Sequence, residues 1–163
     1  MSATQPRTDP PARIRVAVIT FELHGRRFGL PAASVREIYP AVTITPLPGA
    51  PVSVEGVVDV RGTVAPVFDL RSRFGLPSRP QEPDDHLIIA QAADRVVVLR
   101  VDRALDLVQV PADQLQPAAL PDVRLPHVAG VAQLPEGLVV ICDLTAFLSS
   151  AESIQLAAAL EAT

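Results

Sequence analysis

Short apolar stretches that alternate with polar residues run through most of this chain, and turn residues separate them. The range 14–23 (IRVAVITFEL) alternates, and 27–30 follows it after the turn His24-Gly25-Arg26, so the two ranges predict a β-hairpin. Further strands are predicted at 35–39, 56–60, 63–68, 86–90, 95–101, 104–110, 130–134 and 138–142. The range 111–125 has little periodicity and is predicted to be a loop.

Two of the predicted hairpins repeat each other. Residues 56–70 read GVVDVRGTVAPVFDL and residues 130–144 read GVAQLPEGLVVICDL, so Gly-Val opens and Asp-Leu closes both segments at equal spacing. The similarity extends upstream, where 26–38 aligns with 95–107. We therefore expect a duplicated, all-β architecture with about five strands in each half.

Helical signals are few and short. Asp69 and Asp143 each follow an apolar strand and are predicted N-caps, and Ser149 with Glu152 fits a capping box. The Pro-rich range 75–85 is the best internal boundary. The expected organisation is a disordered tail at 1–13, subdomains at about 14–80 and 81–150 with some strand exchange between them, and a C-terminal helix at 151–163.

Composition narrows the class of protein. Hydrophobic residues make up 48% of the chain but aromatics only 4%, so the core must be aliphatic, and 17 prolines argue against long helices. The net charge is −4 and every basic residue is Arg, which excludes a P-loop lysine and makes nucleic acid an unexpected partner. No apolar run is long enough to span a membrane and no signal peptide is visible, so the expected location is cytoplasmic.

The residues that could carry chemistry have simpler interpretations. Asp69 and Asp143 are candidate paired carboxylates, which leaves a small β-barrel hydrolase as a remote alternative, but capping explains both. Cys142 lies in the apolar run LVVIC and is expected to be buried, and a single cysteine excludes an internal disulfide. The histidines lack metal-ligand spacing. We therefore expect no catalytic residues, no metal and no cofactor.

Two charged residues suggest binding instead. Arg61 lies at the tip of a predicted hairpin (VRGT), where an arginine is either solvated or an interface anchor. Glu37, in VREI, is the expected outward residue of its strand and is a candidate for a polar contact on an edge strand.

The ordered series FELHGRRFGLP, VREI, TPLPGAP and GVVDVRGTVAPVFDL resembles the CheW-like family, and VVLRVD, PADQLQP and GVAQL continue the match over about 14–150. The resemblance implies two SH3-like β-barrel subdomains that share an apolar seam. It also implies a non-enzymatic adaptor that joins the cytoplasmic tip of methyl-accepting chemoreceptors to the regulatory domain of the CheA histidine kinase. Such an adaptor is expected to be monomeric when isolated and to be recruited to membrane receptor arrays without inserting into the membrane.

The resemblance also assigns candidate site residues. Motif positions place Val35, Glu37 and Gly56 toward the kinase, and Arg61, Leu30, Val64 and Val98 toward the receptor. The family commonly reads NLRG where this chain has Asp59-Val60-Arg61-Gly62, so Asp59 is a candidate ion-pair partner of Arg61. An adaptor of a parallel pathway, such as pilus-based motility, fits the sequence equally well.

Overall fold

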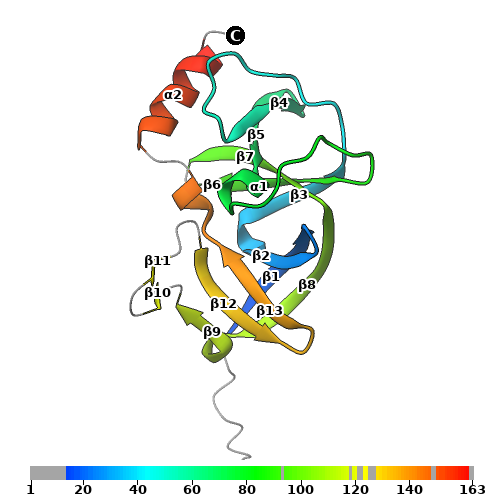
Figure 1. Cartoon of the computed structure of the whole chain (residues 1–163), viewed down its shortest axis with the longest axis vertical. Helices are drawn as coiled ribbons and strands as arrows, with labels where there is room; N and C mark the ends of the chain where they lie inside the picture. The colour runs from blue at the N-terminus through cyan, green and yellow to red at the C-terminus, as the bar shows by residue number, and fades with distance from the viewer. Residues whose placement is uncertain are drawn as a thin grey trace, which may run out of the picture.

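The computed structural model describes residues 14–92, 94–117, 119–120, 123–124, 128–147 and 150–161. Sheet A contains β1 (Arg15–Leu23), β2 (Arg26–Pro31), β8 (Arg103–Pro111), β9 (Leu115–Pro117), β12 (Val128–Leu134) and β13 (Gly137–Cys142). Sheet B contains β3 (Val35–Pro40), β4 (Val54–Val60), β5 (Thr63–Asp69), β6 (His86–Ala92) and β7 (Arg95–Val101). The strand orders are β8-β1-β2-β13-β12-β9 and β3-β6-β7-β5-β4. The predicted all-β fold is therefore confirmed, with sheet A below sheet B in Figure 1.

The two sheets do not divide the chain near residue 80. Sheet B uses one continuous segment, 35–101, whereas sheet A combines 15–31 with 103–142. The predicted subdomain boundaries are therefore corrected: the chain crosses between the sheets at 31–35 and at 101–103. The physical reason is that β1 pairs with the distant β8, and the local pattern of apolar residues does not encode such long-range pairing.

Three buried apolar clusters organise the described part of the chain. One consists of side chains from the strands of sheet B: Val58, Ala65, Val67, Leu87, Ile89 and Val98. Another consists of side chains from the strands of sheet A: Val18, Val110, Ala132, Val139 and Ile141. The third lies between the sheets and draws on both, with Phe21 and Phe28 from sheet A and Phe68 and Leu99 from sheet B. This third cluster is the apolar seam that the fold prediction required.

The repeated hairpins have the same construction. In β4–β5 and in β12–β13 the register shifts next to the first glycine, Gly56 or Gly130. A Cβ on Gly56 would lie 2.2 Å from the carbonyl oxygen of Thr45, and one on Gly130 would lie 2.6 Å from that of Gln116. Each glycine therefore allows a neighbouring backbone segment to cross close to its hairpin.

The predicted helix caps are confirmed. Asp69 precedes α1 (Leu70–Arg73), and its carboxylate accepts hydrogen bonds from the backbone N–H groups of Arg71 and Ser72 at 3.0 and 3.5 Å. Asp143 precedes the 3₁₀ helix η3 (Leu144–Phe147) and accepts from the backbone N–H and the hydroxyl of Thr145. Each carboxylate thus stabilises the start of the short helix that follows its strand, by accepting hydrogen bonds there.

The C-terminal helix α2 (Ser150–Glu161) packs on the end of sheet B (Figure 1). Leu156 and Ala159 are buried in the seam cluster, and the Gln155 side chain donates a hydrogen bond to the carbonyl oxygen of Gly49 at 3.1 Å. The helix is therefore part of the folded unit. The predicted capping box, Ser149 with Glu152, involves side chains outside the described residues.

The loop prediction for 111–125 is wrong. The described residues there include the 3₁₀ helix η2 (Ala112–Gln114), the strand β9, and a small ladder of β10 (Ala119–Leu120) with β11 (Val123–Arg124). These elements have two or three residues each, too few for alternation to be visible in the sequence. A further 3₁₀ turn, η1 (Ala32–Ser34), connects the sheets.

Candidate functional site

Arg61 lies at the tip of the β4–β5 hairpin in an unfavourable backbone conformation. Its φ is 49° and that of Gly62 is 86°, so both central residues of the turn have positive φ, as a type I′ turn requires. A left-handed conformation costs a residue with a Cβ about 1–2 kcal/mol, and Asn or Gly is usual at this position. The geometry of the turn therefore does not explain why an arginine is present.

The Arg61 side chain is 76% exposed, and its Nη2 lies 2.5 Å from Oε1 of Glu37. Glu37 also accepts a hydrogen bond from the hydroxyl of Tyr39, so its carboxylate is held from two sides. Because β3 and β4 are the two outer strands of sheet B, this ion pair links one edge of the sheet to the turn that follows the other. The pair thus forms where the sheet curls into a barrel.

A pocket of about 300 Å³ opens beside this ion pair. It is lined by Arg36, Glu37, Val60, Arg61, Thr63, Ile89 and Val96. These residues come from all five strands of sheet B and from the β4–β5 turn. The pocket is therefore one open end of the sheet B barrel, with an arginine and a glutamate at its rim.

Asp59 does not pair with Arg61, contrary to the prediction from the sequence. Its Oδ1 accepts a hydrogen bond from the backbone N–H of Gly62 at 2.7 Å. Asp59 therefore stabilises the turn itself, as Asp and Asn side chains commonly do, and leaves the guanidinium of Arg61 to Glu37. The departure from the family motif supports the conformation of Arg61 instead of neutralising its charge.

The other candidate residues have different environments. Val35 is half-buried, and Val64 is 54% exposed. Gly56 is buried beneath the segment that contains Thr45. Leu30 and Val98 have no exposed surface, so neither side chain contacts a partner in this conformation. The accessible residues around the Arg61–Glu37 ion pair form what we call the β3–Arg61 surface: Val35, Glu37, Tyr39, Arg61 and Val64.

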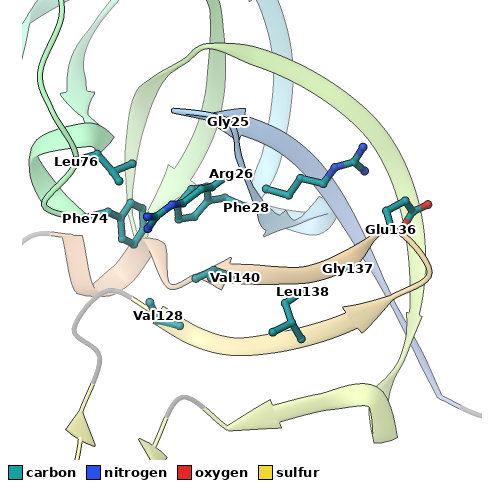
Figure 2. A pocket seen from close by; sticks show the side chains of 11 residues that line it. Gly25, Arg26, Phe28, Phe74, Leu76, Val128, Glu136, Gly137, Leu138 and Val140 are labelled. Carbon is teal, nitrogen blue, oxygen red and sulfur yellow. The ribbon is translucent and has the colours of Figure 1, made fainter.

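A second and larger pocket, of about 530 Å³, lies between sheet A and the segment that follows α1, which leads out of sheet B (Figure 2). One wall consists of Phe74 and Leu76, which follow α1 on the sheet B side. The opposite wall comes from sheet A: it includes the β1–β2 turn, the β12–β13 turn and Phe28, whose ring centroid lies 4.8 Å from that of Phe74. We call this cavity the inter-sheet pocket.

Six charged side chains form a cluster next to the inter-sheet pocket. They are Glu55, Arg71, Arg79, Asp85, Arg100 and Asp102, and they are linked by ion pairs of 2.5 to 3.1 Å. Burial opposes the ionisation of Asp85 and Asp102, but their hydrogen bonds outweigh it, so the pKa of both carboxyls lies below its usual value. For Glu55 burial prevails over the hydrogen bond from Arg100, and its pKa is raised.

The residues considered for catalysis have structural roles. Asp69 and Asp143 are occupied as helix caps. Cys142 is buried, and burial raises the pKa of its thiol, which disfavours the reactive thiolate. Within the described ranges, no three His, Cys, Asp or Glu side chains gather as a metal ion would require. Among the same residues, no helix is sufficiently long and apolar to cross a bilayer.

The sequence interpretation missed the inter-sheet pocket and the charged cluster. One signal was present, because Arg100 interrupts an otherwise apolar strand (RVVVLRV) and a charged residue there requires a partner. The partners could not be identified, since Glu55 and Asp85 precede Arg100 by 45 and 15 residues.

Comparisons with known proteins agree on one family. The sequence model of the CheW-like domain family matches residues 17–152. Chemotaxis protein CheW of Rhizobium meliloti is 30% identical over 137 residues, which cover 83% of this chain and 88% of that protein. Protein FrzA of Myxococcus xanthus is 32% identical over 123 residues, covering 75% and 77%. The crystal structure of scaffolding protein TtCheW from Thermoanaerobacter tengcongensis matches with a TM-score of 0.72 and 26% identity, covering 79% of this chain and 89% of that one.

Proposed function

We propose that this chain, which belongs to the CheW-like domain family, couples methyl-accepting chemoreceptors to the regulatory domain of a CheA histidine kinase. It acts as a chemotaxis scaffold without turnover of its own, and its recruitment places it at the cytoplasmic tips of the receptors. The similarity to a scaffolding protein of known structure over most of both chains supports this proposal.

The observation that carries the proposal is the exposed Arg61–Glu37 ion pair. Arg61 occupies a turn position that disfavours arginine, so local stability does not account for it. Its guanidinium keeps donors free for a partner, because one carboxylate does not satisfy all five N–H groups. Arginine is enriched at protein interfaces for this reason.

On this basis Glu37 and Val35 face the kinase from the free edge of β3, and Arg61 with Val64 faces the receptor. Gly56, a further kinase-side candidate, acts indirectly by letting β4 pack closely against the backbone of Thr45. The two proposed contact regions meet at the Arg61–Glu37 ion pair, where Nη2 of Arg61 lies 2.5 Å from Oε1 of Glu37. A receptor that binds Arg61 therefore changes the environment of Glu37, and a kinase that binds Glu37 changes that of Arg61. Binding of the two partners is therefore expected to be coupled.

A quantitative pull-down tests the proposal with the purified chain, a receptor signalling fragment and the kinase regulatory domain. We expect Arg61→Ala to weaken receptor capture about tenfold or more while kinase binding survives, and Glu37→Ala to weaken kinase binding. Arg103→Ala is a matched control, because Arg103 is also an exposed arginine paired with a glutamate, Glu22, but lies on sheet A. If wild type binds neither partner at micromolar concentrations, the function proposed is wrong.

The similarity to Protein FrzA supports a second candidate, an adaptor in a parallel chemosensory pathway such as pilus-based motility. The two candidates predict the same scaffolding mechanism with different receptors and kinases. Capture of a pilus-pathway kinase in preference to the flagellar one, from the same host, would favour this second candidate.

A further inference from the structure

Asp102 lies at the point where the chain crosses from β7 in sheet B to β8 in sheet A. Its backbone N–H donates to the carbonyl oxygen of Glu22 at 3.0 Å, which fixes the crossover against β1. Its carboxylate points toward groups from both sides of the inter-sheet pocket. This position makes Asp102 a contact between the two pocket walls.

The sheet A wall is held by a hydrogen bond from a backbone N–H group to the Asp102 carboxylate. The N–H of His24, in the β1–β2 turn, donates to Oδ2 of Asp102 at 2.8 Å. The residues that follow in the chain, Gly25, Arg26 and Arg27, line the pocket directly. Asp102 therefore anchors the turn from which this wall is built.

The opposite wall is held through Arg71 in α1. Its Nη2 lies 2.6 Å from Oδ2 of Asp102, and its Nε lies 3.3 Å from Oδ1, so the pair is bidentate. Arg71 also donates from Nη1 to the carbonyl oxygen of Pro77, and its own carbonyl accepts from the N–H of Leu76. The segment 70–77, which supplies Phe74 and Leu76 to the pocket, thus closes around Arg71.

Arg79 completes the contact. Its Nη2 bonds to Oδ1 of Asp102 at 2.8 Å and to Oδ1 of Asp85 at 2.6 Å, which connects Asp102 to the rest of the charged cluster. The Arg71 side chain is 7% exposed and that of Asp102 is 20% exposed, so solvent competes weakly for these bonds. Removing one carboxylate would leave a buried guanidinium without its main acceptor.

We propose that Asp102 is a clasp that sets the opening of the inter-sheet pocket. Its charge holds the β1–β2 turn and the segment 70–77 at a fixed separation, and loss of that charge releases the two walls from each other. The contact between Phe28 and Phe74, where the two walls meet, remains and acts as the pivot.

Two readouts test the clasp in the whole 163-residue chain. The chain has no Trp, so Leu76→Trp introduces a single tryptophan on the wall formed by the segment 70–77, and acrylamide quenching of its fluorescence reports its exposure. Amide hydrogen exchange at His24 and Gly25 reports the opposite wall. In Asp102→Asn we expect exchange at these amides to be about tenfold faster and the fluorophore to be quenched more strongly, with the interior of sheet B unchanged.

A matched control is Asp59→Asn. Asp59 makes the corresponding carboxylate bond to a turn amide, that of Gly62, but on the exposed surface of sheet B alone. Its replacement should leave both pocket readouts at wild-type values. Asp102→Glu, which keeps the charge, should restore much of the protection that Asp102→Asn loses.

Wild-type quenching and exchange in a folded Asp102→Asn protein would overturn the proposal. So would exchange that accelerates uniformly across both sheets, because that result indicates general destabilisation. If Asp102→Asn does not fold, Arg71→Lys takes its place, because it keeps the positive charge but cannot bond both carboxylate oxygens of Asp102 through Nε and Nη2. Stronger quenching in Arg71→Lys supports the clasp, and unchanged quenching contradicts it.

Discussion

At the scale of single residues, Asp69 determines where β5 ends and α1 begins. Its carboxylate accepts two backbone N–H groups that the helix cannot satisfy itself. We expect Asp69→Ala to lower the free energy of unfolding by about 1 kcal/mol, and Asp69→Asn to be nearly neutral because Asn is also a good cap. Urea denaturation measures both, with the exposed Asp84→Ala as the control.

The same variants address the hydrolase alternative. If Asp69 or Asp143 were catalytic, Asp69→Asn or Asp143→Asn would abolish a measurable turnover while leaving stability intact. A cap predicts the opposite combination for the alanine variants, a loss of stability with no activity to lose.

The buried carboxylates also predict how stability depends on pH. Asp85 and Asp102 have a lower pKa in the folded state than in the unfolded state, so their stabilisation is present above about pH 4 and is lost as pH falls through the folded pKa. Glu55 has the opposite sign: its raised pKa means that protonation of Glu55 favours the folded state. We therefore expect the free energy of unfolding to decrease below about pH 4.

Urea titrations between about pH 7 and 3 measure this dependence. Asp102→Asn should have a shallower acid slope than wild type, because one of the two carboxylates that drive the loss is gone. An acid slope equal to that of wild type would mean that Asp102 does not have a depressed pKa.

At the scale of elements, the crossing at Gly56 is the most sensitive point of the repeated hairpin. An added Cβ would lie 2.2 Å from the Thr45 carbonyl oxygen, so Gly56→Ala must displace a backbone segment. We expect a loss of about 2 kcal/mol or more in thermal or urea unfolding. Gly25→Ala is the control, because Gly25 has a positive φ but open space around it, and should cost about 1 kcal/mol.

This prediction also separates two explanations of a binding defect. If Gly56→Ala weakens kinase binding in proportion to its loss of stability, Gly56 acts by supporting β4. Full stability with lost binding would instead place Gly56 in direct contact with the partner.

The elements that sequence predicted correctly are those defined by local chemistry. Alternation identified the longer strands, and the caps at Asp69 and Asp143 follow from a carboxylate at the start of a helical turn. The short strand β9 was missed because three residues show no periodicity. The Arg61–Glu37 pair was also missed, since it depends on the curling of sheet B and not on a neighbouring motif.

At the scale of the whole molecule, the seam cluster joins both sheets into one unit. Phe21 and Phe28 from sheet A pack in the same cluster as Phe68 and Leu99 from sheet B. We therefore expect a single cooperative unfolding transition, with the calorimetric enthalpy equal to the van't Hoff enthalpy. Two resolved transitions in calorimetry would show that the sheets are independent domains.

The insertion of 35–101 within sheet A has a consequence for biosynthesis. As the polypeptide leaves the ribosome, the strands of sheet B become available as one uninterrupted stretch and can assemble as soon as residue 101 has emerged. The hairpin β1–β2 is made first, yet its partners β8 and β13 are translated only after all of sheet B. The earliest part of the nascent chain therefore waits longest for its neighbours, and its unpaired edges are the natural target for chaperones during translation.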